Sequence, residues 1–530
     1  MENAQILIAG LLLAVALLGG LAQWIKVPYP IVLVIGGAVF GFMPGMPDIQ
    51  IDPDVVLLIF LPPLLYVAAS FSNASDLRAD TRVILMSSVF LVLVTAAAVA
   101  VVAHAVIPDL PWAAAFVLGA IVSPTDPLAG AQIMRQLHVP RRLVAVVEGE
   151  GLFNDATALV VYRVAVAAAV VGTFSVADAG LELVAGAIGG VAIGLLVAMV
   201  IAAIRRRLTD PNVSITVSLL TGYAAYIPAH EIHASGVLAT VTAGLYMGQR
   251  FAKDLDPRTR LRGRMVWDSL DFLLNATLFV LIGLQLPAVL NGLDATEPAT
   301  LVGYAALVSG VVIVTRLVWA NTSPYLVRLL DRRPQQRERR VGFKPRMVAA
   351  WAGMRGAVSL AAALAIPITT DKGEPFPQRE LLIFITFGVI FATLVLQGLT
   401  LPAVIRWAGV GGGEEEEDEL ELVTRLAATR AALVEIDALA EAEWTRGESV
   451  ERMRGLYTFR ERRLEGRGAP IRAGSPDYEY QSFRWQLMAR RVLQAQRNEI
   501  VRMRDAGEIP NDVMNIVLRD LDLEEARLEI

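Results

Sequence analysis

The sequence contains no cysteine and few charged residues for its length. Because none of the 530 residues is cysteine, disulfide bonds, thiolate chemistry and cysteine-based metal sites are excluded. Charged residues make up only 19% of the chain and lie in narrow bands between long apolar runs, and the net charge of −5 gives no indication of nucleic-acid binding. The N-terminus, Met1-Glu2-Asn3-Ala4, lacks the basic residues of a secretory signal, so we expect the apolar run behind it to be a retained helix.

Apolar residues dominate the remainder of the composition. Hydrophobic residues are 55% of the chain and form runs that match the roughly 20 residues of a membrane-crossing helix. The pattern predicts an all-α polytopic membrane protein in a lipid bilayer, and we expect neither enzyme activity nor a cofactor. We expect thirteen transmembrane helices, at residues 5–23, 29–44, 54–71, 83–107, 112–134, 146–171, 178–204, 212–228, 234–249, 268–290, 299–325, 347–367 and 380–408.

Basic residues indicate how these spans are oriented, because cytoplasmic loops of membrane proteins are enriched in lysine and arginine. The loops between the basic ones carry almost no lysine or arginine. We therefore expect a protein of the cell membrane, with its N-terminus outside and its C-terminus in the cytoplasm. The basic residues occupy alternate loops, at Arg78 and Arg82, at Arg135, Arg141 and Arg142, at Arg205–Arg207, and within residues 250–264 and 328–346.

The composition changes after Gly411-Gly412-Gly413. Residues 1–410 form the predicted transmembrane domain, whereas residues 411–530 are highly charged and carry apolar residues at helical spacing. We expect a cytoplasmic helical domain here, with helices near residues 448–464, 478–505 and 511–528. This tail packs on itself or on a neighbouring subunit, or it has a regulatory role.

The fifth span is interrupted by Ser123-Pro124-Thr125-Asp126-Pro127. Each proline lacks a backbone donor and leaves the carbonyl four residues earlier, at Ala120 or Ser123, without its helical partner. Exposed backbone at membrane depth is tolerated where it lines a cavity or is buried in protein. The free carbonyls, two hydroxyls and the Asp126 carboxylate form an oxygen-rich surface that suits a hard cation. The alternative is a structural kink in which Asp126 caps the following half-helix.

The sixth span carries carboxylates, which are costly at membrane depth. Glu150 and Asn154 are four residues apart and share a face of the helix, whereas Asp155 lies about 100° round from Asn154. A carboxylate that binds and releases an ion must be free of a permanent partner, whereas a carboxylate with a structural role needs a permanent cationic side chain beside it. We therefore predict that Glu150 pairs with Arg316 and that Asp155 stays free. The alternative for Glu150 is a shallow position near the cytoplasmic interface.

The twelfth span is interrupted by glycine, in Gly353-Met354-Arg355-Gly356. If spans 1–6 and 8–13 are two inverted repeats, the broken helices are the fifth and the twelfth, and each is fifth in its half. Paired interruptions at corresponding positions are typical of the midplane site of a secondary transporter. We expect Arg355 to compensate charge at the second interruption.

Three other charged residues of the spans are assigned to the membrane interfaces. Asp268 and Asp271 lie near the inner end of the tenth span, so we expect them at the interface. Arg163 is expected to extend its long side chain to the outer interface.

Three motifs together resemble a known family. They are Ser-Pro-Thr-Asp-Pro at 123–127, Glu-Gly-Glu-x-x-x-Asn-Asp-Ala at 148–156 and Gly-Met-Arg-Gly-Ala-Val-Ser at 353–359. They resemble monovalent cation/proton antiporters of the CPA1 class, which includes the NhaP proteins and the animal NHE exchangers. The resemblance covers most of residues 1–410. It implies a thirteen-span inverted-repeat fold of the NhaA and NhaP kind, with a mobile core domain and a dimerisation domain, in a homodimer.

The resemblance also implies roles for single residues. Asp155 is expected to be shared between cation and proton, and members commonly pair the residues that match Glu150 and Arg316. The adjacent Asn and Asp mark the electroneutral branch of the class. We expect the monovalent cation to be held chiefly by Asp155 and Asp126. The predicted cation and proton site consists of Asp155, Asn154, Asp126, Thr125 and Ser123.

Two positions depart from the family pattern. Many members have serine where this chain has Gly151, and some archaeal relatives have glutamate where it has Val67. Because both oxygens are absent, the ion shell must be completed from elsewhere or by water. We expect Na⁺ as the transported ion, with Li⁺ and K⁺ as alternatives.

The predicted activity is exchange by competition, with a role in pH homeostasis. The site binds either a cation or a proton at Asp155, and an empty, charged site should not cross the membrane. A cation channel or a non-transporting sensor could use the same oxygens and would be distinguished by uncoupled or absent flux. An intramembrane aspartyl protease would need a paired-aspartate motif such as Gly-x-Gly-Asp, which the sequence lacks.

Overall fold

The computed structural model describes residues 2–528 except 26, 44–57, 73, 172–175, 292–296, 331–340, 372, 413, 443, 468–477, 507 and 509. The described residues are helical apart from connecting segments and two isolated β-bridges. The chain divides into two compact units, Met1–Gly412 and Gly413–Ile530, and each is described by itself.

The polytopic helical fold of the first unit is confirmed, whereas the total of thirteen spans stays a prediction. Four shorter apolar helices cover Ala9–Ile25, Tyr29–Gly41, Leu61–Phe71 and Trp112–Val122. Among the described residues, six helices are long and apolar enough to cross a bilayer by length and composition: Thr81–Val106, Arg141–Val170, Val184–Arg205, Pro257–Leu284, Pro298–Tyr325 and Arg379–Ala408.

One group of helices in this unit consists of α1 (Glu2–Ile25), α2 (Tyr29–Gly41), α4 (Leu61–Phe71), α11 (Val176–Arg205), α12 (Pro211–Glu231), α13 (Gly236–Asp254) and α14 (Pro257–Leu284). Within it, α14 lies along α2, and α13 lies against both α4 and α11. Aromatic side chains join three of these helices: the rings of Tyr66 and Trp267 have centroids 5.2 Å apart, and Trp267 Nε1 donates to Ser218 Oγ (3.1 Å).

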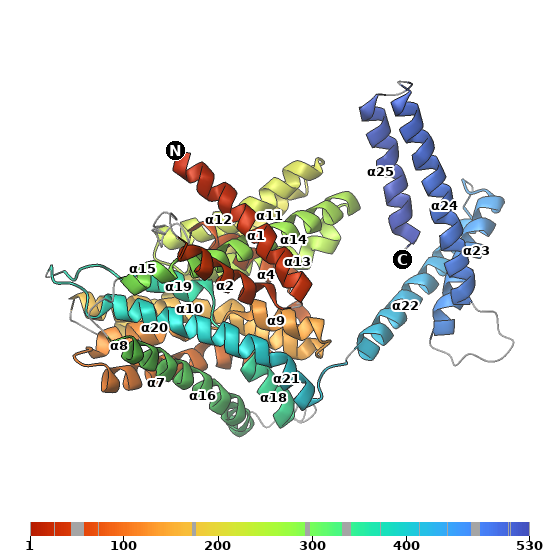
Figure 1. Cartoon of the computed structure of the whole chain (residues 1–530). Helices are drawn as coiled ribbons and strands as arrows, with labels where there is room; N and C mark the ends of the chain where they lie inside the picture. The colour runs from red at the N-terminus through yellow and green to blue at the C-terminus, as the bar shows by residue number, and fades with distance from the viewer. Residues whose placement is uncertain are drawn as a thin grey trace. The chain divides into compact units, whose positions relative to one another are not determined.

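The second group consists of α6 (Thr81–Leu85), η1 (a π-helical segment, Met86–Leu91), α7 (Val92–Val106), α8 (Trp112–Val122), α9 (Pro127–Gln136), α10 (Arg141–Val171), α16 (Pro298–Leu330), α18 (Phe343–Trp351), α19 (Ala357–Leu364), α20 (Arg379–Ala392), η2 (Thr393–Gln397) and α21 (Gly398–Ala408). In Figure 1, α20 and α21 follow one another along one line. α10 packs against α8, α9 and η1, and α16 packs against α7, α18 and α20. The apolar core between α8, α16 and α20 includes the fully buried Leu118, Val312 and Ile385. Two short helices, α5 (Ala74–Ala79) and α15 (Leu286–Asn291), complete the unit.

Three helices begin with an aspartate followed by proline: α9 at Asp126-Pro127, α12 at Asp210-Pro211 and α14 at Asp256-Pro257. In each, the aspartate side chain accepts the backbone N–H two residues later, at 2.9, 2.7 and 2.9 Å respectively. Proline fits the first helical position because its missing N–H has no intrahelical partner there. This cap starts α14 at Pro257, ahead of the tenth predicted span, because polar residues extend the helix beyond its apolar stretch.

The second unit contains α22 (Glu414–Ala440), α23 (Gly447–Arg467), α24 (Tyr478–Asp505) and α25 (Asn511–Leu528). The three helices expected in the tail are confirmed. α22 and α23 are joined by ion pairs between Arg430 and Glu461 (2.9 Å) and between Arg454 and Asp437 (2.7 Å). The unit therefore packs on itself, helix against helix.

Candidate functional site

Two pairs of half-helices meet in the second helix group. Residues 123–126 separate α8 from α9, and residues 352–356 separate α18 from α19. The connecting segments pair in an isolated antiparallel β-bridge, in which the Asp126 N–H donates to the Met354 carbonyl (2.8 Å). Interruptions that lie more than 200 residues apart in the chain therefore form one crossing.

Asp126 lies at the N-terminal ends of two helices. Its Oδ1 accepts the Leu128 N–H in the first turn of α9 (2.9 Å). Its Oδ2 lies against Gly356, the residue before α19. The approach is so close that a Cβ added to Gly356 would be only 1.8 Å from this oxygen. Helix N-termini carry a positive partial charge, so the position stabilises a carboxylate. The capping role left open by the sequence is present, and the same residue also lines a cavity.

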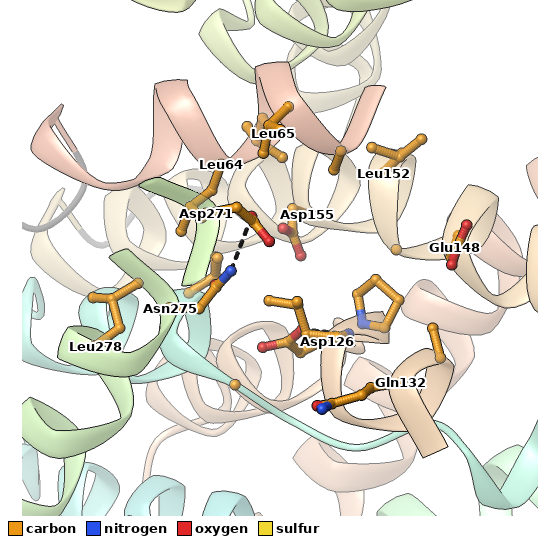
Figure 2. A pocket seen from close by; sticks show the side chains of 18 of the residues that line it. Leu64, Leu65, Asp126, Gln132, Glu148, Leu152, Asp155, Asp271, Asn275 and Leu278 are labelled. Atoms are coloured by element: carbon orange, nitrogen blue, oxygen red, sulfur yellow. Dashed lines mark hydrogen bonds between the residues drawn. The ribbon is translucent and has the colours of Figure 1, made fainter. Parts of the chain in front are cut away.

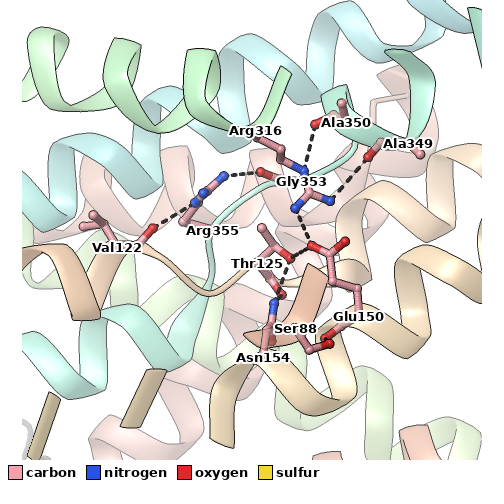
Figure 3. A network of polar contacts seen from close by, with 10 residues as sticks. All are labelled: Ser88, Val122, Thr125, Glu150, Asn154, Arg316, Ala349, Ala350, Gly353 and Arg355. Carbon is pink, nitrogen blue, oxygen red and sulfur yellow. Dashed lines mark hydrogen bonds and ion pairs between the residues drawn. The ribbon is translucent and has the colours of Figure 1, made fainter. Parts of the chain in front are cut away.

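Arg355 occupies the complementary position at two helix C-termini. Its Nε donates to the Val122 carbonyl at the end of α8 (3.0 Å), and its Nη1 donates to the Gly353 carbonyl just beyond α18 (2.5 Å), as Figure 3 shows. Its backbone N–H donates to Thr393 Oγ1 of η2 (3.1 Å). The side chain is buried, and helix C-termini carry a negative partial charge. These are the contacts expected of a charge-compensating arginine.

A buried polar network holds α10 to the first interruption (Figure 3). Arg316 forms a salt bridge with Glu150 and donates through Nε to the Ala350 carbonyl (2.9 Å). Glu150 Oε1 also accepts the Thr125 hydroxyl (3.0 Å). Asn154 Nδ2 donates to the Thr125 hydroxyl oxygen (2.9 Å) and carbonyl (3.1 Å). Glu150 is 6% exposed and Arg316 is 3% exposed, so Glu150 is not solvated at an interface.

Asp155 lies on a different face of α10 from Glu150 and lines a cavity of about 530 Å³. In the described part of the chain, no hydrogen-bond or ion-pair partner of its carboxylate is found. Figure 2 shows Asp155 and Asp126 at the edge of this cavity, and Thr125 also lines it. The structure therefore brings together, around one space, three of the residues assigned to the ion site.

Ser123 and Asn154, the other two assigned residues, do not line this cavity. Ser123 is buried and donates its hydroxyl to the Ala120 carbonyl (2.9 Å), one of the two carbonyls that the prolines leave free. Asn154 is buried behind Thr125, which it orients. Both side chains therefore support the interruption from behind and do not face the cavity.

The mouth of the cavity carries exposed charged residues. Arg135, beyond the fifth span, is 67% exposed and pairs with Glu148. Arg264 is also exposed, and its Nε lies 3.4 Å from Asp268 Oδ1. All four residues line the cavity, and the two arginines belong to the basic segments of the sequence. The cavity therefore opens on the side of the basic loops.

The cavity also has polar lining residues that were not assigned to the site from the sequence, among them Asp271 and Asn275 of α14. The interfacial position expected for Asp271 stays a prediction; in the structure the residue is half-buried and lines the cavity. Because α14 begins at Pro257, Asp271 lies about 20 Å along the helix, at 1.5 Å per residue. Asp271 and Asn275 are four residues apart, so they share one face of a mostly apolar stretch of helix. This spacing is the sequence feature that could have identified them as residues of the site. Asp268, by contrast, is 61% exposed.

Gly151 and Val67, the two departures from the family pattern, both line the cavity. A Cβ on Gly151 would lie 2.5 Å from ring atoms of Pro127, so α9 and α10 approach this closely only because the residue is glycine. A serine here would displace Pro127, the residue directly after Asp126. The departure at Gly151 therefore changes the packing of the site as well as its oxygen atoms.

Alanine at Gly356 should destabilise the protein, because the added methyl group has no room beside Asp126 Oδ2. Overpacking of this kind costs about 1–3 kcal/mol. We expect a lower melting temperature in detergent than for wild type. Gly303→Ala in α16 is the matched control, since a Cβ at this position would have no atom within 4 Å among the described residues. Equal melting temperatures of the two variants would show that Asp126 is not held against Gly356.

Comparison with known proteins decides the family. Residues 11–407 match the family described as "Sodium/hydrogen exchanger, transmembrane". The chain belongs to the sodium/hydrogen exchanger family. This exchanger is 37% identical to an uncharacterised Na⁺/H⁺ exchanger of Mycobacterium tuberculosis, over 98% of this chain and 97% of the relative. The resemblance drawn from the three motifs is confirmed.

Two further comparisons concern the family and the fold. The exchanger is 32% identical to the sodium, potassium, lithium and rubidium/H⁺ antiporter of Bacillus pumilus, over 71% of this chain and 57% of that protein. Its fold is similar to that of the sodium proton antiporter MjNhaP1 from Methanocaldococcus jannaschii, with a TM-score of 0.56 and 21% identity. That match covers 76% of this chain and 98% of the other.

Proposed function

We propose that this exchanger moves a monovalent cation against protons by alternating access, with Asp155 as the residue that both ions share. The observation that carries the proposal is the Asp155 carboxylate, which has no partner among the described residues and lines a cavity that also contains Asp126. Asp155 and Asp126 supply charge to the cation, and Thr125 supplies a hydroxyl oxygen. Asn154 and the Glu150–Arg316 pair hold Thr125 in place.

Competition between the cation and the proton for Asp155 accounts for the coupling of their movements. A carboxylate at membrane depth is costly unless it is neutralised, so the site is stable in the membrane with either a cation or a proton bound. The empty site carries an uncompensated charge, and its transfer across the apolar barrier is disfavoured. Because the neighbour of Asp155 is the neutral Asn154, we propose electroneutral exchange.

The positive-inside rule and the cavity together give the proposed orientation. The cavity opens beside Arg135 and Arg264, in loops that this rule assigns to the cytoplasm. The described conformation is then open to the cytoplasm, with the N-terminus outside and the C-terminal unit inside the cell. A homodimer in the cell membrane is proposed on the family resemblance alone.

Na⁺ is the proposed principal ion, and we propose that Li⁺ and K⁺ are also accepted. The relative from Bacillus pumilus is named for exchange of sodium, potassium, lithium and rubidium. In this chain, Gly151 and Val67 contribute no side-chain oxygen to the cavity. A site with few fixed oxygens leaves part of the ion shell to water, which relaxes the constraint on ion size.

Inverted membrane vesicles with an acidic interior test the function. Addition of NaCl, LiCl or KCl should release protons with saturable dependence on cation concentration, and clamping the membrane potential should leave the rate unchanged. The rate should fall at low pH, where protons occupy the site, and at high pH, where protons are scarce. Unsaturating flux that collapses the membrane potential would identify a channel, and a rate that follows the potential would contradict electroneutrality.

A further inference from the structure

Asp271 reaches the cavity from the helix group opposite to the one that carries Asp126 and Asp155. Asp126 and Asp155 belong to the first interruption and to α10, whereas Asp271 belongs to α14, which packs along α2. Figure 2 shows Asp271 and Asp155 turned toward the same space, with the apolar side chains of Leu64 and Leu65 beside them. The cavity therefore has a carboxylate on each of two facing walls.

The carboxylates of α10 and α14 fall into two classes. Glu148, Glu150 and Asp268 each have an arginine partner. Asp155 and Asp271 have none among the described residues. These two are also the ones that lie deep in the cavity, away from its exposed mouth. An unpaired carboxylate at this depth is expected to face water or an ion.

A hydrogen bond orients Asp271 without neutralising it. Asn275 Nδ2 donates to Asp271 Oδ1 (3.0 Å), and Asn275 is buried. An amide carries no charge, so the negative charge of the carboxylate remains available to a cation. The opposite arrangement occurs one turn earlier, where Arg264 lies against Asp268 at the exposed mouth. Asp268, at the mouth of the cavity, is therefore paired with an arginine, whereas Asp271, further inside, has only a neutral hydrogen-bond partner.

We propose that Asp271 is a further cation-binding residue, which coordinates the monovalent cation between the cavity mouth and Asp155 when the site is open to the cytoplasm. This inference rests on the proposed function. Because α14 does not belong to the helix group that carries Asp126 and Asp155, relative movement of the groups separates Asp271 from the ion. Asp271 therefore raises the affinity of the site for the cation only when the site is open to the cytoplasm. Val67 of α4 lines the same cavity but offers no oxygen, so α14 supplies the carboxylate of this wall.

Sided transport measurements test the inference. Inside-out and right-side-out vesicles would report the KM for Na⁺ at the cytoplasmic and external faces separately. For Asp271→Asn we expect the cytoplasmic KM to rise roughly tenfold, as befits loss of one charged contact. The external KM and the maximal rate per folded protein should stay within about twofold of wild type. Asp268→Asn removes the same charge from the same helix and should change neither KM.

The outcomes separate this inference from the proposed function. An unchanged cytoplasmic KM in Asp271→Asn, or an equal rise at both faces, would overturn the role of Asp271 and leave sodium/proton exchange intact. An equal effect of Asp268→Asn would show general attraction by negative charge and would also overturn it. If Asp271→Asn yields no folded protein, Asp271→Glu decides, since a displaced carboxylate should alter the cytoplasmic KM alone. Full exchange by Asp155→Asn would instead contradict the proposed function.

Discussion

Replacement of Asp155 by asparagine should abolish cation-coupled proton movement while the protein still folds. The variant keeps the size of the side chain but removes the group that we propose holds both the cation and the proton. A contact to a charged group away from water is worth about 1.5–3 kcal/mol, and both transported ions lose theirs. We therefore expect the exchange rate to fall by at least about 100-fold. In vesicles, the readout is dequenching of a pH-sensitive dye after addition of NaCl.

Folding of Asp155→Asn should be normal, because no described residue loses a hydrogen bond or ion pair with Asp155. Detergent melting temperature and the yield of folded protein are the measurements. Asp268→Asn is the matched control: it makes the same chemical change at a residue that is 61% exposed, and it should keep wild-type exchange. Substantial sodium-driven proton release by Asp155→Asn would place the exchanging group elsewhere.

Replacement of Glu150 by alanine should have its main effect on folding. Arg316 is 3% exposed and would be left as a buried charge without its carboxylate. Removal of one partner of a buried pair costs about 3–5 kcal/mol. Thr125 would also lose the acceptor of its hydroxyl. We expect a marked loss of folded protein, with the apparent cation affinity of the remaining protein changed much less.

Two further variants make this prediction specific. Glu148→Ala lies two residues away on the same helix, but its partner Arg135 is 67% exposed, so loss of that pair should cost about 1 kcal/mol or less. The double variant Glu150→Leu with Arg316→Met removes both charges and should recover much of the lost stability, because no buried charge remains unpaired. A Glu150→Ala protein of normal stability with altered cation affinity would refute a structural role for Glu150.

The partner or conformation of a residue was predictable from the sequence where burial leaves a charged or polar group unsatisfied. A carboxylate and an arginine at membrane depth must be neutralised, and this reasoning leads to the contact between Glu150 and Arg316 that the structure contains. The prolines of residues 123–127 likewise predict a change of backbone direction, because they remove hydrogen-bond donors. In both cases the cost of an unsatisfied group is local, so it can be read from the residues alone.

Contacts between distant helices were not predictable in the same way. The position of Asp271 depends on which face of α14 meets α10 across the cavity, and the partners of Arg355 depend on where α8 ends relative to α18. From the sequence, the Ser123 hydroxyl has two plausible roles: its oxygen could coordinate a cation, or its O–H could donate to a free carbonyl. In the structure it donates to the Ala120 carbonyl. A single sequence does not determine which helix faces and side chains meet in these cases.

The bridge between Asp126 and Met354 has a mechanical consequence. It fixes the two connecting segments to each other, and the bond from Arg355 to Val122 adds a second link across the same crossing. The four half-helices therefore have little freedom to shear past one another. If the group moves as a body, as the proposed alternating access requires, the spacing of the oxygens at the proposed ion site is preserved. We then expect the order of preference among cations to be set by this rigid crossing and to be the same from either face of the membrane. The affinity for the cation, by contrast, should depend on whether the crossing faces the wall that carries Asp271.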